Sequence, residues 1–262
     1  ILRKGNHISI YFIVPFYYLF KRNQYDLLID EIHGLPFFTP LYSRKPKIVL
    51  IHEVAGEIWD YMYPFPLNLI GKISEKFYFL FYKNVPFWTD APSTIDDLQK
   101  QGIKKENCVA IPCPAKTTPL SHLPLKEKAP TFIFVSRLVK MKGIENVISA
   151  FGFIYEKEKN AKLWIVGGGE AQYESYLKSL VFEQGLEKQI IFWGRVSEEK
   201  KILLMQKAHL LLHASIKEGW GLVVIEAASQ ATPSIVYNVA GLRDSIINNK
   251  TGIILKANEP QN

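Results

Sequence analysis

Two carboxylates stand at the ends of a glycine-rich segment, Glu218-Gly-Trp-Gly-Leu-Val-Val-Ile-Glu226. Gly219 and Gly221 let the backbone approach a bound molecule closely, because glycine has no Cβ. Residues 222–229 predict a buried helix, whose first turn has unpaired N–H groups and the positive end of the helix dipole. A helix start of this kind binds anions. Taken alone, two glutamates at this spacing are more often a solvated pair at a helix end.

A basic loop follows a predicted buried strand at residues 131–135. Arg137 and Lys142 lie just beyond the carboxyl end of that strand, where open α/β sheets bind their ligands. A planar guanidinium and a point-like ammonium together suit a diphosphate. A solvated basic loop is the alternative. Gly167–Gly169 also follow a predicted strand, but a tight turn from strand to helix needs glycine in any case.

The second half of the chain carries short segments in a fixed order and spacing: Ser136–Gly143, Gly167–Gly169, Phe192–Val196, Ala208–Ser215, Glu218–Ala227 and Val239–Leu242. Together they resemble the retaining nucleotide-sugar glycosyltransferases of family four, which have the GT-B architecture. The resemblance covers nearly everything from Ala129 to Leu255. Two positions depart from the family pattern, His209 for the usual Asp and Ala214 for the usual Pro. Neither is a donor-binding position in the family.

The resemblance implies a role for each matched residue. Glu218 would contact the sugar of a nucleotide diphosphate sugar and Glu226 its ribose, while Arg137 and Lys142, both expected to be exposed, would hold the diphosphate. His52, at the end of a predicted strand, would face the donor sugar. We therefore predict His52 and Glu218 as catalytic residues. The predicted substrate-binding residues are Arg137, Lys142, Gly168, Val196, Gly221, Leu222, Val223 and Glu226.

The chemistry implied is transfer of a hexose from a GDP- or UDP-sugar to a saccharide or lipid-linked acceptor, without a cofactor. The departing diphosphate gains negative charge, which Arg137, Lys142 and the helix start would stabilise without a metal. The resemblance implies retention at the anomeric carbon. No well-placed carboxylate nucleophile is visible, so attack by the acceptor on the face that the diphosphate leaves is the expected route. A neutral His52 can bond a sugar hydroxyl. A strand-end histidine bonded to a backbone carbonyl is the alternative for His52.

Short apolar strands that alternate with helical segments predict an α/β fold of two Rossmann-like, doubly wound parallel sheets facing a cleft. A proline-rich connector places the domains at 1–124 and 125–262. First-domain strands are predicted near 7–14, 26–30, 47–51, 85–89 and 108–111. Second-domain strands are predicted near 131–135, 162–166, 190–193, 209–213, 233–236 and 252–255.

Composition fits a cytoplasmic enzyme. The net charge of +7 is spread over both halves, which argues against nucleic-acid binding, and two cysteines do not make a disulfide framework. Apolar residues 8–20 are too few to span a bilayer. The rings of Phe77–Tyr82 are expected to serve core packing. A peripheral contact with the inner face of the membrane, for a lipid-linked acceptor, is the minority alternative.

Residues 1–7 read as the end of a first helix. In the family a strand and a glycine-rich turn precede that helix, and further helices follow the position of Leu255. We therefore expect an internal fragment of a longer protein, which binds nucleotide but transfers sugar poorly. Two rival functions remain: a nucleotide-sugar epimerase on the same fold, and a non-catalytic nucleotide-sugar-binding fragment.

Overall fold

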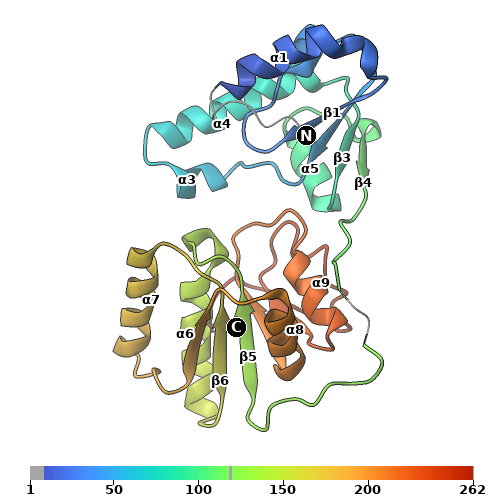
Figure 1. Cartoon of the computed structure of the whole chain (residues 1–262). Coiled ribbons are helices and arrows are strands. Elements are labelled where there is room, and N and C mark those ends of the chain that lie inside the picture. The colour runs from blue at the N-terminus through green and yellow to red at the C-terminus, as the bar shows by residue number, and fades with distance from the viewer. Residues whose placement is uncertain (1–8, 118–119, 262) are drawn as a thin grey trace. The chain divides into compact units, whose positions relative to one another are not determined.

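The computed structural model describes residues 9–117 and 120–261. Contacts group the chain into two units, the first ending at Pro112 and the second beginning at Cys113 (Figure 1). The proline-rich connector up to residue 124 therefore belongs with the second unit. Each unit has its own sheet and its own buried apolar cluster.

The first unit is built on a four-stranded parallel sheet in the order β1-β2-β3-β4. Its strands are β1 (Leu28–Ile32), β2 (Lys47–Ile51), β3 (Phe87–Thr89) and β4 (Cys108–Ala110). Its helices are α1 (Ile10–Lys21), α2 (Thr39–Tyr42), α3 (Ile58–Met62), α4 (Leu67–Tyr78) and α5 (Pro92–Lys100). Short 3₁₀ turns are η1 (Arg22–Gln24), η2 (Phe79–Tyr82) and η3 (Lys105–Asn107).

The strand predicted near residues 7–14 is wrong, because α1 occupies this region from Ile10 onward. Tyr11 and Tyr18 are two helical turns apart and so share a face of α1. The Tyr11 hydroxyl donates to the Leu35 carbonyl at 3.0 Å, and the Tyr18 hydroxyl accepts from Ser43 Oγ at 2.9 Å. Aromatic and β-branched residues favour strands, but these contacts favour the helix here. The helix end predicted at residues 1–7 lies outside the described residues.

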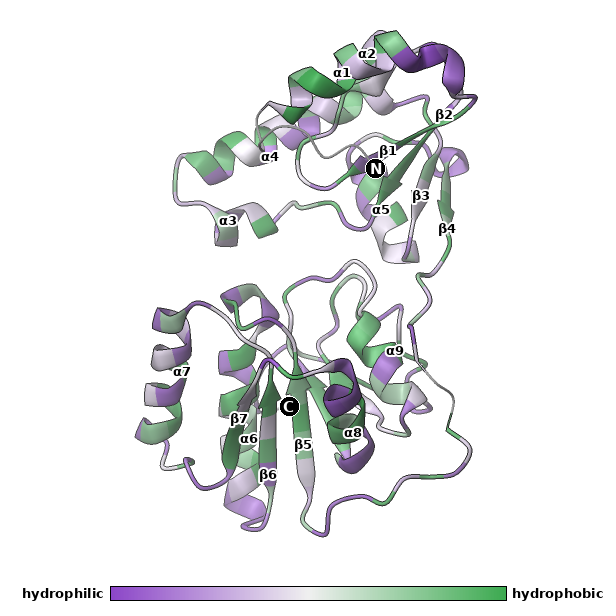
Figure 2. Ribbon diagram, in the orientation of Figure 1, coloured by the Kyte–Doolittle hydropathy of each residue, from purple (hydrophilic) through white to green (hydrophobic). Residues whose placement is uncertain are grey.

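Three buried rings of the first unit come from α4 and η2. Tyr78, Phe79 and Tyr82 pack in the core, whereas Ile73 and Phe77 are exposed. The core packing predicted for the rings of Phe77–Tyr82 is confirmed for Tyr78, Phe79 and Tyr82 and is wrong for Phe77, because Phe77 lies on the flank of α4 that faces away from the core. Figure 2 shows apolar residues along α1 and α4. Within the described residues, no helix combines the length and apolarity that crossing a bilayer requires.

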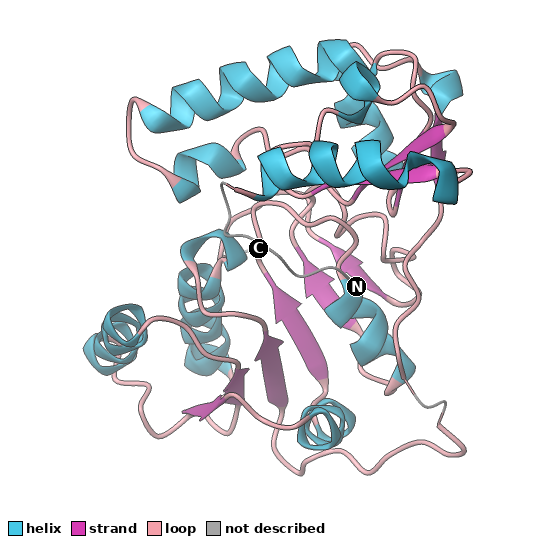
Figure 3. Cartoon of the chain, turned by 45° about the horizontal axis from the view of Figure 1, so that its top comes forward, coloured by secondary structure: helices cyan, strands magenta, loops and turns pink. Residues whose placement is uncertain are grey.

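The second unit is a six-stranded parallel sheet in the order β10-β9-β8-β5-β6-β7. Its strands are β5 (Thr131–Val135), β6 (Lys162–Val166), β7 (Ile190–Gly194), β8 (Leu210–His213), β9 (Ser234–Val236) and β10 (Gly252–Ile254). Its helices are α6 (Ile144–Lys157), α7 (Ala171–Glu183), α8 (Glu198–Lys207) and α9 (Leu222–Ser229), with the 3₁₀ turn η4 (Lys140–Lys142). Helices lie on either side of the strands (Figure 3).

Both faces of this sheet are buried. One cluster packs α6 and α7 against β5, β6 and β8, and the other packs α8 and α9 against alternate residues of the same strands. Strands buried on both faces read as continuous apolar runs, so all six second-domain strands were predicted within two residues of their observed ends. His209, the departure from Asp, accepts the Thr131 backbone N–H on Nδ1 at 3.0 Å and so joins β8 to β5.

Candidate functional site

The strand order of the second unit reverses between β5 and β8. From β5 the chain adds β6 and β7 on one side and then returns to add β8, β9 and β10 on the other. Doubly wound sheets bind ligands at the carboxyl ends of the strands beside such a reversal. A pocket of about 290 Å³ lies there. Its lining residues are Val135, Ser136, Lys142, Lys201, His213, Glu218, Gly221, Leu222, Val223 and Glu226.

Glu218 meets three donors on a single oxygen. Its Oε1 accepts from Lys142 Nζ at 2.6 Å, from Ser215 Oγ at 2.8 Å and from His213 Nε2 at 3.0 Å. Its Oε2 has no hydrogen-bond partner among the described residues. The side chain is 15% exposed. Glu218 therefore presents one unused acceptor to the pocket.

The charge state of Glu218 follows from these contacts. Burial raises the pKa of its carboxyl, but the His213 hydrogen bond and the charge of Lys142 outweigh burial and lower the pKa to about 2. Glu218 is therefore ionised at neutral pH. An ionised carboxylate can only accept hydrogen bonds, as from a hydroxyl group.

Two glycines bring the segments around Glu218 together. Gly143 has φ 68°, and a Cβ on it would collide with the Ala214 carbonyl oxygen, so the Lys142 loop can lie against the end of β8. Gly241 has φ 79°, and a Cβ there would collide with the carbonyl oxygen of Glu218. Both positions require the left-handed conformation and the close approach that glycine allows.

Glu226 lies on α9 and also lines the pocket. Its Oε2 lies 2.9 Å from Lys201 Nζ, which also lies 2.8 Å from the exposed Glu198. Among the described residues Oε1 of Glu226 has no partner. The Lys201 side chain is 15% exposed. Burial opposes the charge of Lys201, but the hydrogen bonds to Glu198 and Glu226 raise its pKa.

Between the two glutamates, the pocket contains the start of α9. The helix spans Leu222–Ser229 as predicted, with Gly221 in the left-handed conformation at its N-cap and no side chain capping it. Gly221, Leu222 and Val223 line the pocket. The first N–H groups of a helix have no partner within it, so this end offers donors and positive potential to an anion.

The remaining predicted residues differ in their placement. Lys142 was expected to be exposed, which is wrong: its side chain is 13% exposed because it pairs with Glu218. Arg137 is exposed and follows Ser136, but it does not line the pocket. Gly168 lies where a Cβ would be 3.0 Å from the Arg195 side chain, and Val196 packs at the edge of a core cluster. Neither lines the pocket.

His52 belongs to a separate group in the first unit. It follows β2, and its Nδ1 lies 2.5 Å from Oδ2 of Asp90, which follows β3. Its Nε2 lies 3.8 Å from Glu31 in β1, and its side chain is 40% exposed. The His52 ring thus bonds the Asp90 carboxylate, and not a backbone carbonyl as in the alternative interpretation of the sequence. A carboxylate on Nδ1 leaves Nε2 of a neutral imidazole as an acceptor.

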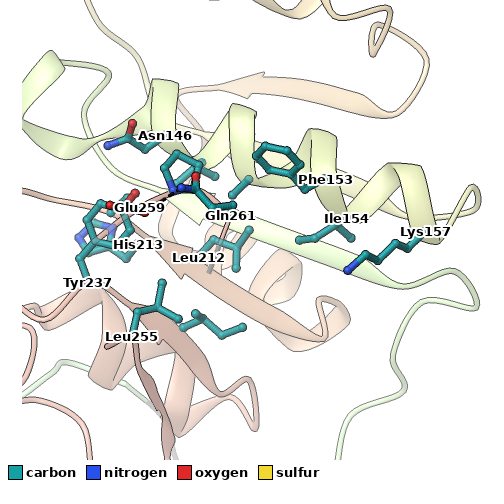
Figure 4. A pocket seen from close by; sticks show the side chains of 15 residues that line it. Asn146, Phe153, Ile154, Lys157, Leu212, His213, Tyr237, Leu255, Glu259 and Gln261 are labelled. Carbon is teal, nitrogen blue, oxygen red and sulfur yellow. Dashed lines mark hydrogen bonds between the residues drawn. The ribbon is translucent and has the colours of Figure 1, made fainter. Parts of the chain in front are cut away.

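A second cavity, also of about 290 Å³, touches the first at His213. Phe153 and Ile154 of α6 line one side of it, and His213 and Tyr237 lie opposite (Figure 4). Its lining is mainly apolar. His213 therefore lines both the pocket around Glu218 and this apolar cavity.

The residues of these groups that were not predicted include Lys201, His213, Ser215 and Asp90. His213 ends a predicted strand, which is the signal that singled out His52. Asp90 directly follows a predicted strand and so carries the same signal, whereas Lys201 carries none, because its pocket partner Glu226 is remote in sequence. Across residues 9–117 and 120–261, no cluster of three or more His, Cys, Asp or Glu side chains could hold a metal ion.

Curated relatives match the second half of the chain. An uncharacterized glycosyltransferase of Methanocaldococcus jannaschii is 34% identical over 128 residues, 49% of this chain and 32% of that protein. A GDP-mannose-dependent alpha-(1-6)-phosphatidylinositol monomannoside mannosyltransferase of Mycobacterium tuberculosis is 29% identical over 137 residues, 48% of this chain and 34% of that protein. The chain thus spans about a third of the length of these relatives.

Solved structures match nearly the whole chain. Anabaena HepE in complex with UDP and glucose gives a TM-score of 0.71 at 16% identity, over 99% of this chain and 72% of that one. Sucrose-phosphate synthase of Thermosynechococcus elongatus gives a TM-score of 0.74 at 20% identity, over 100% of this chain and 68% of that one. At these identities the likeness shows the fold, and it confirms the predicted α/β architecture of GT-B type.

The family model "Glycosyl transferases group 1" matches residues 119–262. This match covers more than half of the chain and includes every residue that lines the pocket at the β5–β8 reversal. The chain belongs to the glycosyl transferases group 1 family.

Proposed function

We propose that this chain binds a nucleotide diphosphate sugar in the pocket at the β5–β8 reversal and takes part in transfer of its hexose to an acceptor hydroxyl. The observation that carries the proposal is the pair of pocket glutamates, each held by a lysine on one oxygen and, within residues 9–117 and 120–261, without a partner on the other. Two such acceptors on either side of a helix start match a donor with two hydroxyl-bearing sugars joined by a diphosphate. The resemblance assigns Glu218 to the hexose and Glu226 to the ribose.

In this function the start of α9 stabilises the departing diphosphate. The bond from the anomeric carbon to the phosphate oxygen breaks, and the acceptor oxygen bonds that carbon on the same face. Attack on that face gives retention, and the acceptor proton passes to the departing phosphate. Arg137 adds an exposed guanidinium. An ammonium has three N–H donors, so Lys142 can hold Glu218 and still bond a phosphate oxygen. We propose that this stabilisation needs no metal.

His52 would contribute from the first unit. With Asp90 holding Nδ1, its Nε2 can accept a hydroxyl of the donor sugar or of the acceptor. A saccharide or a lipid-linked molecule remains the proposed acceptor. The exposed apolar side of α4, with Ile73 and Phe77 beside the exposed Lys76, supports the lipid-linked choice and a peripheral contact at the inner, cytoplasmic face of a membrane.

Two rival functions are open to the same pocket. An epimerase would interconvert the free nucleotide sugar without an acceptor, and a non-catalytic fragment would bind it and release it unchanged. Transfer of labelled sugar to an added acceptor separates the first rival from a glycosyltransferase. Unchanged recovery of the nucleotide sugar, with acceptor present, would favour the second.

The test is a binding screen of the 262-residue chain against UDP-glucose, GDP-mannose, UDP and GDP, read by melting shift and calorimetry. We expect at least one nucleotide sugar to bind more tightly than its own nucleoside diphosphate. The parent is compared with Glu218→Gln, which should lose this advantage, and with Glu187→Gln, an exposed glutamate of the same unit, which should keep it. No binding of any of the four compounds would contradict the proposal.

A further inference from the structure

His213 is a buried histidine with one nitrogen in use. It is the last residue of β8, and its side chain is 1% exposed. Nε2 lies 3.0 Å from Glu218 Oε1 and 3.3 Å from Ser215 Oγ. Nδ1 is buried and has no hydrogen-bond partner among the residues that the structure describes. The ring also lines the apolar cavity on its other side (Figure 4).

These contacts determine which nitrogen carries the proton. A neutral imidazole has one N–H, and a buried N–H without an acceptor is costly. A proton on Nδ1 would have no acceptor, whereas a proton on Nε2 meets the Glu218 carboxylate. His213 is therefore the Nε2–H form, and it donates to Oε1 of Glu218.

Among the three donors to that oxygen, His213 has the most rigid support. Lys142 has a flexible four-carbon stem and lies in the short turn η4, and Ser215 lies in the loop after β8. His213 belongs to a strand paired with both β5 and β9, and its ring packs 5.9 Å from Phe134. The direction of the Glu218 carboxylate therefore depends first on the imidazole.

We propose that His213 is a positioning residue for donor recognition: its Nε2–H holds Oε1 of Glu218, so that Oε2 alone receives a hydroxyl of the donor sugar. The inference rests on the proposed function and names the residue that orients Glu218 toward the donor sugar. In this proposal His213 acts on the sugar through Glu218. Its effect must therefore appear in recognition of the sugar and be absent from recognition of the nucleoside diphosphate.

The experiment compares three substitutions of His213. In His213→Gln the amide nitrogen can take the place of Nε2, in His213→Asn the donor is too short to reach Glu218, and His213→Leu fills the space without a donor. His122→Asn, at an exposed connector histidine, makes the same chemical change as a control. Calorimetry gives the affinity ratio of UDP-glucose to UDP and of GDP-mannose to GDP for each protein, and melting curves report folding.

We expect His213→Asn and His213→Leu to reduce the sugar-dependent ratio by roughly tenfold, the usual worth of a hydrogen bond to a charged group, with UDP and GDP affinity unchanged. His213→Gln should recover most of the ratio, and His122→Asn should match the parent. If His213→Asn is unfolded, His213→Leu decides the result.

Three results overturn the inference in different ways. An unchanged ratio in His213→Leu, with the parent preferring a nucleotide sugar, would show that His213 does not position Glu218 and would leave the proposed function intact. A parent that prefers neither UDP-glucose to UDP nor GDP-mannose to GDP would remove the sugar contact itself, and the inference with it. Equal loss of UDP, GDP and sugar-nucleotide binding would mean that His213 acts on the whole pocket.

Discussion

Each unit contains a largely buried glutamate, and the two use their oxygens differently. In the first unit, Glu75 accepts from the backbone N–H of Ala55 and the Tyr78 hydroxyl on Oε1. On Oε2 it accepts from the Gly56 N–H and Trp59 Nε1. In the second unit, Glu218 receives three donors on Oε1 and none on Oε2. Both are buried carboxylates, but only one has an acceptor to spare.

The difference separates a structural carboxylate from a candidate binding one. Glu75 is 2% exposed and ties the loop after His52 to α4, and every donor it meets belongs to the protein. Burying Glu218 with one oxygen unused is costly unless a ligand or solvent completes the bonds. Glu226 follows the pattern of Glu218, with Lys201 on one oxygen only. Unused acceptors at a pocket are thus a better guide to function than burial alone.

The largest expected effect is on Glu75. Glu75→Ala leaves two backbone N–H groups and two side-chain donors without an acceptor, so we expect the first unit to lose about 3 kcal/mol or more. Urea denaturation and hydrogen exchange at residues 53–57 measure this loss. Glu57→Ala, at an exposed position of the same loop, should change stability by less than about 0.5 kcal/mol. Equal losses of stability in Glu75→Ala and Glu57→Ala would contradict the structural role given to Glu75.

The second effect is a pH dependence that Glu218 gives the second unit. Its pKa falls from an ordinary 4.5 to about 2 on folding, so its stabilisation is complete above about pH 4.5 and is lost as the pH falls toward 2. The shift corresponds to roughly 3 kcal/mol. Urea midpoints measured between pH 2 and 6 should show a shallower acid slope in Glu218→Gln than in the parent. An unchanged slope would mean that Lys142 and His213 do not hold the carboxylate.

The third prediction concerns the diphosphate. Arg137→Ala should weaken UDP or GDP binding by roughly tenfold, because a charge-assisted bond is lost, and should leave stability unchanged, because the side chain is exposed. Calorimetry and a melting curve test both parts. Lys140→Ala removes another exposed cation of the same loop and is the control. Equal losses in the two variants would point to a general charge effect.

The smallest effect is expected at the ribose end. Glu226→Gln should weaken UDP or GDP severalfold, because an amide is a poorer partner for hydroxyls than a carboxylate. Glu198→Gln changes the other partner of Lys201, which is exposed, and should have no effect. Calorimetric titration with UDP and GDP distinguishes the two variants. If Glu226→Gln binds UDP and GDP like the parent while Glu218→Gln does not, the proposed orientation of the donor is reversed.

Local sequence predicted the parts of the fold whose pattern does not depend on distant contacts. The strands at 47–51, 131–135 and 162–166 and the helix at 222–229 match the observed bounds, because uninterrupted apolar runs bounded by polar or glycine residues are decisive. The run that became α1 has the same composition as a strand. Only its contacts with the segment 35–43 settle its conformation.

The site was predicted by residue type but not by pairing. Glu218, Glu226 and Lys142 were named and do line one pocket. The ion pair between Lys142 and Glu218 could not be predicted from the sequence, because the two residues are far apart in the chain. Lys201 escaped notice for the same reason. Ion pairs between residues that are distant in sequence become visible only in the folded structure.

The close approach of Gly241 to the Glu218 carbonyl has a consequence for mutational tolerance. A side chain at 241 would displace the backbone that carries Glu218, although glycine offers no group that could bind a ligand. In a saturation screen for donor binding, Gly241 should therefore tolerate as few replacements as Glu218 does. Intolerance to substitution at Gly241, which has no functional side chain, would then show that its backbone supports the position of Glu218.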